Sequence, residues 1–148
     1  MIIVDTREQK NAHILAYFDR HSIEYKKQKM DVADYQIEGQ DRLVIDRKQN
    51  LDELSRNLMN RSDHSRFYKE VRRAKEQNIK MIVLCEHGGQ ITDIKSVANW
   101  HSKYSPVSGR SLMEEIYRVH IAYGVEFKFC QKRSTGKRII EILEGTNG

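Results

Sequence analysis

Hydrophobic and polar positions recur along this chain with two periods, one typical of helices and one typical of strands. Ile14, Leu15 and Phe18 follow helical spacing, whereas elsewhere apolar residues run together or alternate singly with polar ones. From these patterns we expect strands over residues 1–4, 23–30, 35–38, 43–46, 79–85 and 125–129. We expect six helices. The first spans residues 11–21, the second begins at residue 50 and ends at a break over 60–63, and the third follows that break and ends at 77–78. The other three span residues 93–100, 112–123 and 135–143.

The clearest strand is the segment 79–85, which is almost continuously apolar and bounded by polar residues. Such a run is typical of the middle of a parallel sheet. The segment 23–30 instead carries Lys26, Lys27 and Lys29, as edge strands often do. Because strands and helices alternate through the second half, after a hairpin in the first half, the pattern predicts an α/β fold with a central mixed sheet between helices.

The segments 35–38 and 43–46 are joined around Gly39 and predict a β-hairpin. A turn centred near Gly39 to Gln40 sets Asp34 roughly opposite Asp46, so that two carboxylates from distant positions lie side by side. Like charges in that arrangement are unfavourable, and a cation between them would relieve the repulsion.

The alternation of side chains along the second strand sorts the charged residues that follow it. Asp46 and Lys48 point to one face, and Arg47 points to the other. The end of the first strand brings Asp5 close to this group. Two acids, a lysine and a divalent ion suit phosphodiester hydrolysis, with Mg²⁺ or Mn²⁺ held by carboxylate oxygens. A polar hairpin with solvated ion pairs would show the same spacing, so the residues alone leave both interpretations open.

Length and charge narrow the classes of function. At 148 residues the chain fits one domain, residues 1–148, and its 26 Lys and Arg against 21 Asp and Glu give a net charge of +5. This surplus suits a polyanionic partner. No apolar run approaches the ~20 residues of a membrane span, and the first residues lack the pattern of a signal peptide. We therefore expect a cytoplasmic protein without membrane contact.

Two motifs resemble those of one family. The hairpin reads A-D-x(11)-D-R-K-x(3)-D, which is similar to the G-D-x(n)-E-R-K-x(3)-D signature of the XPF-type structure-specific endonucleases, and D-T-R-E from Asp5 to Glu8 is similar to the family's D-x-R-E element. The resemblance covers nearly the whole chain. It implies a restriction-endonuclease-like α/β/α sandwich and a homodimeric, metal-dependent DNA endonuclease that cuts near branches, flaps or junctions in repair or recombination.

The resemblance also implies roles for individual residues. Asp5, Asp34, Asp46 and Lys48 match the catalytic positions, and the three acids among them match metal ligands for Mg²⁺ or Mn²⁺. Supporting roles fall to Arg7, Glu8, Arg47 and Asp52. An acid in the first turn also stabilises a helix by itself, which is the alternative for Asp52.

The chain departs from the family's pattern in ways that keep other functions open. Ala33 replaces the usual Gly, Asp46 replaces the usual Glu, and no helix-hairpin-helix module is expected within the chain. One alternative is a non-catalytic DNA-binding or regulatory module on the same scaffold. Another alternative is a resolvase that cuts four-way junctions. Compact relatives of this kind indicate a prokaryotic or phage source.

Basic and aromatic residues outside the motifs are candidates for contact with DNA. Arg56 and Arg61 follow the hairpin and are expected to bind phosphates. Trp100, Tyr104 and Tyr117 could stack on bases, although burial or dimer packing is the more common role of aromatic side chains.

Overall fold

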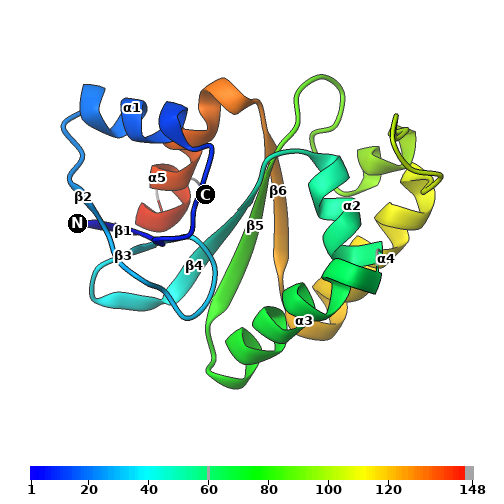
Figure 1. Cartoon of the computed structure of the whole chain (residues 1–148), viewed down its shortest axis with the longest axis horizontal. Helices are drawn as coiled ribbons and strands as arrows, with labels where there is room; N and C mark the ends of the chain where they lie inside the picture. Colours follow the sequence, from blue (N-terminus) through cyan, green and yellow to red (C-terminus); the bar gives the residue numbers. More distant parts are fainter. Residues whose placement is uncertain (60, 146–148) are drawn as a thin grey trace.

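The computed structural model describes residues 1–59 and 61–145, and of residues 61–65 it describes the backbone only. One six-stranded sheet runs through the molecule in the order β2-β1-β3-β4-β5-β6 (Figure 1). Its strands are β1 (Ile2–Val4), β2 (Tyr25–Lys27), β3 (Tyr35–Ile37), β4 (Gln40–Lys48), β5 (Lys80–Glu86) and β6 (Glu126–Cys130). The helices are α1 (Ala12–Arg20), α2 (Leu51–Met59), α3 (Arg61–Glu76), η1 (Lys95–Asn99), α4 (Gly109–Tyr123), η2 (Lys132–Ser134) and α5 (Thr135–Glu144).

Helices cover both faces of the sheet, as Figure 1 shows, with α1 and α5 on one side and α2, α3 and α4 on the other. The strand residues alternate accordingly. Ile82 and Leu84 of β5 belong to the core under α1 and α5, whereas Val83 and Cys85 belong to the core under α2, α3 and α4. The predicted α/β sandwich with a mixed sheet is therefore confirmed.

The direction of the strands decides where polar side chains gather. β3 is antiparallel to both β1 and β4, and β5 and β6 are parallel to β4. The carboxyl ends of β1, β4, β5 and β6 therefore lie at one edge of the sheet, together with the start of β3. Open α/β sheets bind their ligands at this edge.

Several predicted boundaries differ from the structure. β2 spans only three residues, because its neighbour β1 offers only three partners. The helix predicted over 93–100 is the short 3₁₀ helix η1, whose last carbonyls pack against Gly109 at the start of α4. The predicted break at 60–63 is shorter than expected, since α3 already begins at Arg61; residue 60 lies outside the described residues.

None of the helices in the described part of the chain combines the length and the apolar composition that crossing a membrane requires.

Candidate active site

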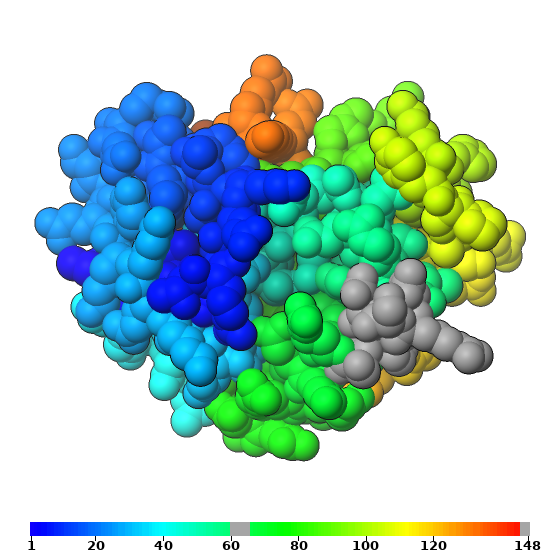
Figure 2. Space-filling view, viewed as in Figure 1, coloured from blue at the N-terminus to red at the C-terminus, as the bar shows by residue number. Residues whose placement is uncertain are grey.

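A polar cleft of about 400 Å³ opens at the carboxyl edge of the sheet. The ends of β1 and β4 form its floor, and α2 and α3 form one wall, so that in Figure 2 it lies between the blue N-terminal segment and the green helices. Its charged lining residues are Asp5, Arg7, Glu8, Asp34, Asp46, Arg47, Lys48, Glu53, Arg66 and Glu70. The cleft thus contains six acidic and four basic side chains from segments distant in the sequence.

Asp34 and Asp46 lie beside one another, as predicted, but a register shift in the hairpin contributes to this: Ile37 pairs with Gln40 next to the turn, and the register changes before Tyr35. Tyr35 pairs with Ile45, and the Asp34 amide donates to the Ile45 carbonyl at 2.9 Å. The Arg47 amide in turn donates to Asp34 Oδ2 at 2.8 Å. The Asp34 carboxylate is therefore fixed by the backbone of the neighbouring strand.

Lys48 lies on the same face as the two acids, as the period-2 pattern predicts. Its Nζ is 2.9 Å from Asp46 Oδ2 and 4.9 Å from the centre of the Phe67 ring. The first contact is an ion pair by distance but is not aligned for a hydrogen bond, because Asp46 Oδ2 is the one buried side-chain oxygen or nitrogen of the described residues without a hydrogen-bond partner. This oxygen is available to a further positive group.

Burial and like charge both act on the carboxylates. Burial, followed by the negative charges of Asp46 and Glu8, raises the pKa of Asp34 well above its ordinary value. Burial lowers the pKa of Lys48, but the carboxylates of Asp46, Asp34 and Glu53 together more than offset this effect, so the net shift is upward and Lys48 carries its proton. The cleft therefore holds an excess of negative charge that one ammonium group does not neutralise.

Asp5 lies in the cleft, and its backbone amide donates to the Asp34 carbonyl at 2.9 Å. Both of its carboxylate oxygens already accept hydrogen bonds. The Met30 amide donates to Oδ1 at 2.8 Å, and Arg7 Nε and the Arg7 amide donate to Oδ2 at 2.9 and 3.2 Å. Burial opposes the charged form, but the bonds from Arg7 and Met30 lower the pKa of Asp5 below its ordinary value. Asp5 thus connects the loop around Met30 to the site.

Arg47 projects from the other face of β4, as predicted. Its Nε donates to Glu8 Oε2 at 2.7 Å, its Nη1 to Glu86 Oε1 at 2.5 Å, and its Nη2 to the Gln9 carbonyl at 2.6 Å. Glu8 also accepts a hydrogen bond from the Tyr35 hydroxyl at 2.7 Å. This buried network supports the strand that carries Asp46 and Lys48.

Sequence reasoning did not single out Glu86, which follows the last apolar residue of the β5 run. Besides Arg47, it contacts His13 Nε2 at 2.5 Å and accepts from the Thr135 hydroxyl at 2.5 Å. A charged residue directly after a buried strand is the signal in the sequence that would have identified it.

Glu70 of α3 is a second site residue that sequence reasoning missed. Its Oε1 accepts a hydrogen bond from the Ala33 amide at 2.8 Å, and Ala33 has a φ of 66°, in the left-handed region. Burial and then the negative charge of Asp46 raise the pKa of Glu70. Glu70 therefore holds the backbone turn that leads into Asp34.

The remaining predicted residues lie apart from the carboxylate pair. Asp52 Oδ1 accepts a hydrogen bond from Ser102 Oγ at 2.6 Å and so anchors the loop before α4. Arg56 lines a separate groove on another face of α2. The side chain of Arg61 lies outside the described residues. Arg66, which was not among the preferred DNA contacts, lines the cleft itself.

The donors of the cleft fit a hard divalent cation in their chemistry. Asp34 and Asp46 supply adjacent carboxylates, and Asp46 Oδ2 lacks a hydrogen bond. Within the ranges 1–59 and 66–145, no three acidic, histidine or cysteine side chains are grouped so that they could surround a metal by themselves. Water or a phosphate oxygen would therefore complete the coordination.

Solved structures of other proteins share the fold of this chain. XPF from Aeropyrum pernix is similar in structure, with a TM-score of 0.74 at 14% sequence identity, over 99% of this chain and 64% of that chain. XPF from Aeropyrum pernix in complex with DNA has a TM-score of 0.73 at 15% identity and the same coverage. The chain thus spans less than two thirds of the length of these XPF chains, and the likeness shows the fold.

A comparison with curated proteins finds no match. A family model, in contrast, matches residues 4–143, which include the D-T-R-E motif from Asp5 and the whole hairpin. This chain therefore belongs to the ERCC4 domain family, the XPF-type nucleases that its two motifs resemble.

Proposed function

We propose that this protein is a Mg²⁺- or Mn²⁺-dependent DNA endonuclease that hydrolyses phosphodiester bonds near branches, flaps or junctions. One observation carries the proposal: Asp34, Asp46 and the charged Lys48 share one face of a hairpin at the floor of an open cleft. Family membership supports nuclease activity on DNA, and the net charge of +5 suits a polyanionic substrate.

Asp34 and Asp46 are the proposed metal ligands, and Asp5 is retained as a further candidate whose oxygens would first have to give up hydrogen bonds. A bound divalent ion polarises the phosphoryl oxygen and lowers the pKa of a water molecule. Lys48 keeps its proton beside Asp46, so its ammonium group can stabilise the negative charge that develops on the phosphate.

Arg7, Glu8, Arg47 and Glu70 act as positioning residues in this proposal. Each holds a segment that carries a ligand: Glu70 holds Ala33 before Asp34, and Arg47 fixes β4 from the opposite face. Arg66 is the basic residue of the cleft best placed to meet a phosphate, because it is exposed and lines the cavity.

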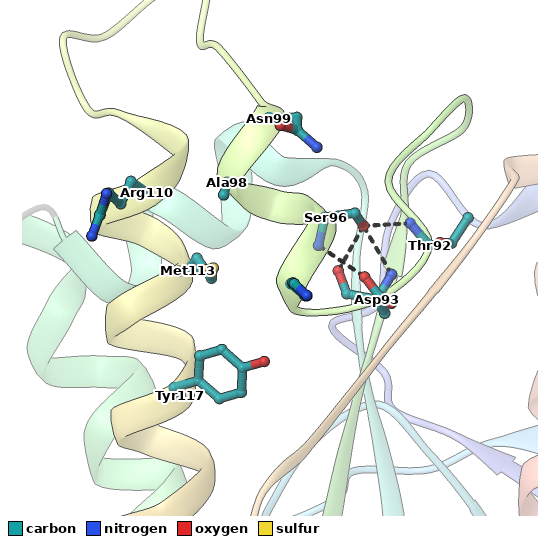
Figure 3. Close-up of a pocket in the computed structure, with 9 residues that line it drawn as sticks. Thr92, Asp93, Ser96, Ala98, Asn99, Arg110, Met113 and Tyr117 are labelled. Carbon is teal, nitrogen blue, oxygen red and sulfur yellow. Dashed lines mark hydrogen bonds between the residues drawn. The ribbon is translucent and has the colours of Figure 1, made fainter.

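A homodimer is part of the proposal. Tyr117 and Ile121, one turn apart on α4, are 39% and 79% exposed. Figure 3 shows Met113 and Tyr117 on α4 beside a groove of about 710 Å³ that α4 shares with η1. Exposed apolar residues on one helix face suit a second copy of the chain, and light scattering on the wild type and on Ile121→Glu would test this surface.

The decisive experiment is cleavage of labelled splayed-arm, flap, four-way and blunt duplex DNA in Mg²⁺, Mn²⁺ or EDTA. We expect cleavage of branched substrates that requires the metal. The variants Asp34→Ala and Lys48→Ala should lose activity by about 10²–10³-fold or more. Asp41→Ala is the matched control: it removes an exposed acid of β4, the strand that carries Lys48, and should cleave normally.

Other outcomes would support one of the alternative functions. A wild-type protein that binds branched DNA but cuts none of the substrates in either metal would be a non-catalytic module. Calorimetry would then show no metal binding that depends on Asp34 and Asp46. Symmetric paired cuts confined to four-way DNA would instead identify a resolvase.

A further inference from the structure

We infer that a second groove, between α2 and the loop 101–108, is a stacking site for an unpaired base of the DNA strand that enters the cleft. The inference rests on the proposed function, because it assigns the feature by which branched DNA would be distinguished from duplex. The groove measures about 310 Å³. Its lining combines an aromatic ring from Tyr104, the apolar side chains of Met59 and Val107, and the guanidinium of Arg56.

Tyr104 is the main evidence for the ligand. Its side chain is 84% exposed, the highest exposure among the exposed large hydrophobic residues of the described chain. Trp100 is only 7% exposed and belongs to the core, so the tryptophan predicted as a possible stacking residue has a structural role. A tyrosine ring with this exposure offers a face to an aromatic partner.

Hydrogen bonds hold the backbone of the loop that carries Tyr104. Ser102 Oγ donates to Asp52 Oδ1 at 2.6 Å and accepts from the amides of Tyr104 and Ser105 at 3.0 and 3.1 Å. A bridge between His101 and Ser108 closes the base of the loop. Little conformational entropy would therefore be lost when a base stacks on the ring.

The charges around the groove favour a nucleic acid over a protein or a small apolar ligand. Arg56 is exposed, and no described residue forms an ion pair with it. Lys103 and His101 are also exposed in the same loop. The one acid of the lining, Asp52, is already engaged by Ser102. An aromatic ring beside cations is the combination that binds single-stranded nucleic acid through stacking and phosphate contacts.

The position of the groove connects it to the cleft. Glu53 and Asn57 of α2 line the cleft, while Arg56 and Met59 of the same helix line the groove. The two cavities thus lie on adjacent faces of one helix, whose diameter is about 10–12 Å. In Figure 2 the yellow-green loop stands beside α2 on the face that also carries the cleft.

This spacing defines the substrate. Because the two cavities lie on adjacent faces of α2, an unpaired strand that leaves the cleft would have to cross only one helix to reach the groove. The bases of an intact duplex are paired and stacked and cannot reach the ring. Only a strand with unpaired nucleotides beside the cut would fill both cavities.

The test measures binding separately from cleavage, by fluorescence anisotropy of labelled splayed-arm and blunt duplex DNA in EDTA. Tyr104→Ala should weaken binding of the splayed-arm DNA by roughly 5- to 150-fold, the range for loss of one stacked base. It should leave binding of the duplex unchanged. Tyr104→Phe and Tyr104→Trp keep an aromatic ring and should restore the affinity for splayed-arm DNA. Because Tyr104 is largely exposed, a thermal melt should show the same folded state for all variants.

A second measurement locates the base. A fluorescent adenine analogue placed in turn at each of the first nucleotides of the unpaired arm should be quenched at one position by the wild type but at none by Tyr104→Ala. Equal affinities of wild type and Tyr104→Ala for splayed-arm DNA would overturn the inference, and so would an equal loss for both DNA forms.

These outcomes are distinguishable from failure of the proposed function. If the protein cleaves DNA but Tyr104→Ala binds normally, only the stacking site is wrong. If Tyr104 governs binding but no metal supports cleavage, only the catalytic proposal is wrong. If the protein binds neither DNA form, both are wrong.

Discussion

Arg47 offers the sharpest test of how this site is built, because its side chain is only 1% exposed and lies between two acids that are also buried. Glu8 receives two of its N–H groups, at 2.7 and 3.1 Å, and Glu86 receives a third at 2.5 Å. The side chains of Glu8 and Glu86 are 8% and 2% exposed, so water cannot replace the guanidinium.

The variant Arg47→Met would leave both carboxylates buried without a counter-charge. Breaking a buried ion pair in this way costs about 3–5 kcal/mol, a large part of the total of about 5–15 kcal/mol for a domain. With a shift of about 2–4 °C per kcal/mol for a chain of this size, we expect the Tm to fall by roughly 6–20 °C. Arg47→Lys should also destabilise the fold, since a lysine cannot reproduce the two-pronged contact with Glu8.

The assay is urea unfolding followed by circular dichroism in EDTA, so that metal binding does not contribute. Arg42→Met, at an exposed position of the same strand, is the matched control and should change the free energy of unfolding by no more than about 0.5 kcal/mol. Neutralising the acids in the triple variant Arg47→Met, Glu8→Gln, Glu86→Gln should recover much of the loss. If Arg47→Met unfolds like the wild type but no longer cleaves DNA, Arg47 acts on the substrate and the structural account is refuted.

Three further predictions concern the stability effects of single residues. Ala33→Gly should raise the free energy of unfolding by about 0.5–1 kcal/mol in urea titrations, because a φ of 66° suits glycine; a loss would contradict the strain argument. Gly109→Ala should lower the free energy of unfolding by about 1–3 kcal/mol in the same titrations, because a Cβ at this position would lie 2.4 Å from the Trp100 carbonyl oxygen. If the variant is as stable as the wild type, α4 can shift to make room for the methyl group. For Asp5, whose pKa is lowered on folding, the stabilisation is complete above its unfolded pKa of about 3.9 and is lost as the pH falls through the folded pKa. The stability difference between wild type and Asp5→Asn, measured in EDTA, should therefore be constant from about pH 5 to 7 and shrink below about pH 4, and a difference that does not shrink would argue against a charged Asp5.

The hairpin and the faces of its side chains were predictable because they depend on local pattern, namely the period-2 alternation and the turn at Gly39, which has a φ of 83°. The turn alone does not pair Asp34 with Asp46: it pairs Ile37 with Gln40, and a register shift between Ile37 and Tyr35 then pairs Tyr35 with Ile45 and so places Asp34 beside Asp46. The same alternation separates Lys48 from Arg47. Asp5 follows β1, which is parallel to β4, so the order and direction of the strands are enough to place it at the same edge of the sheet.

The rest depends on contacts between segments that no local pattern connects. Glu70 reaches Ala33 across 37 positions, and Thr135 reaches Glu86 across 49. The role of Asp52 as an anchor for Ser102 likewise spans 50 positions. Such partners follow from how α3, α5 and the loop before α4 pack on the sheet, and helical periodicity shows only that these helices have an apolar face.

The backbone strain at Ala33 is maintained by the contacts around it. A non-glycine residue in the left-handed region costs about 1–3 kcal/mol and persists only where its surroundings hold it. Here Glu70 binds the Ala33 amide, and the Ile45 carbonyl and the Arg47 amide bind the next residue, Asp34. The strained turn holds the Asp34 carboxylate beside Asp46, although burial and then the repulsion from Asp46 raise its pKa. Since a bound divalent cation would remove that repulsion, metal binding and the stability of this turn should rise together.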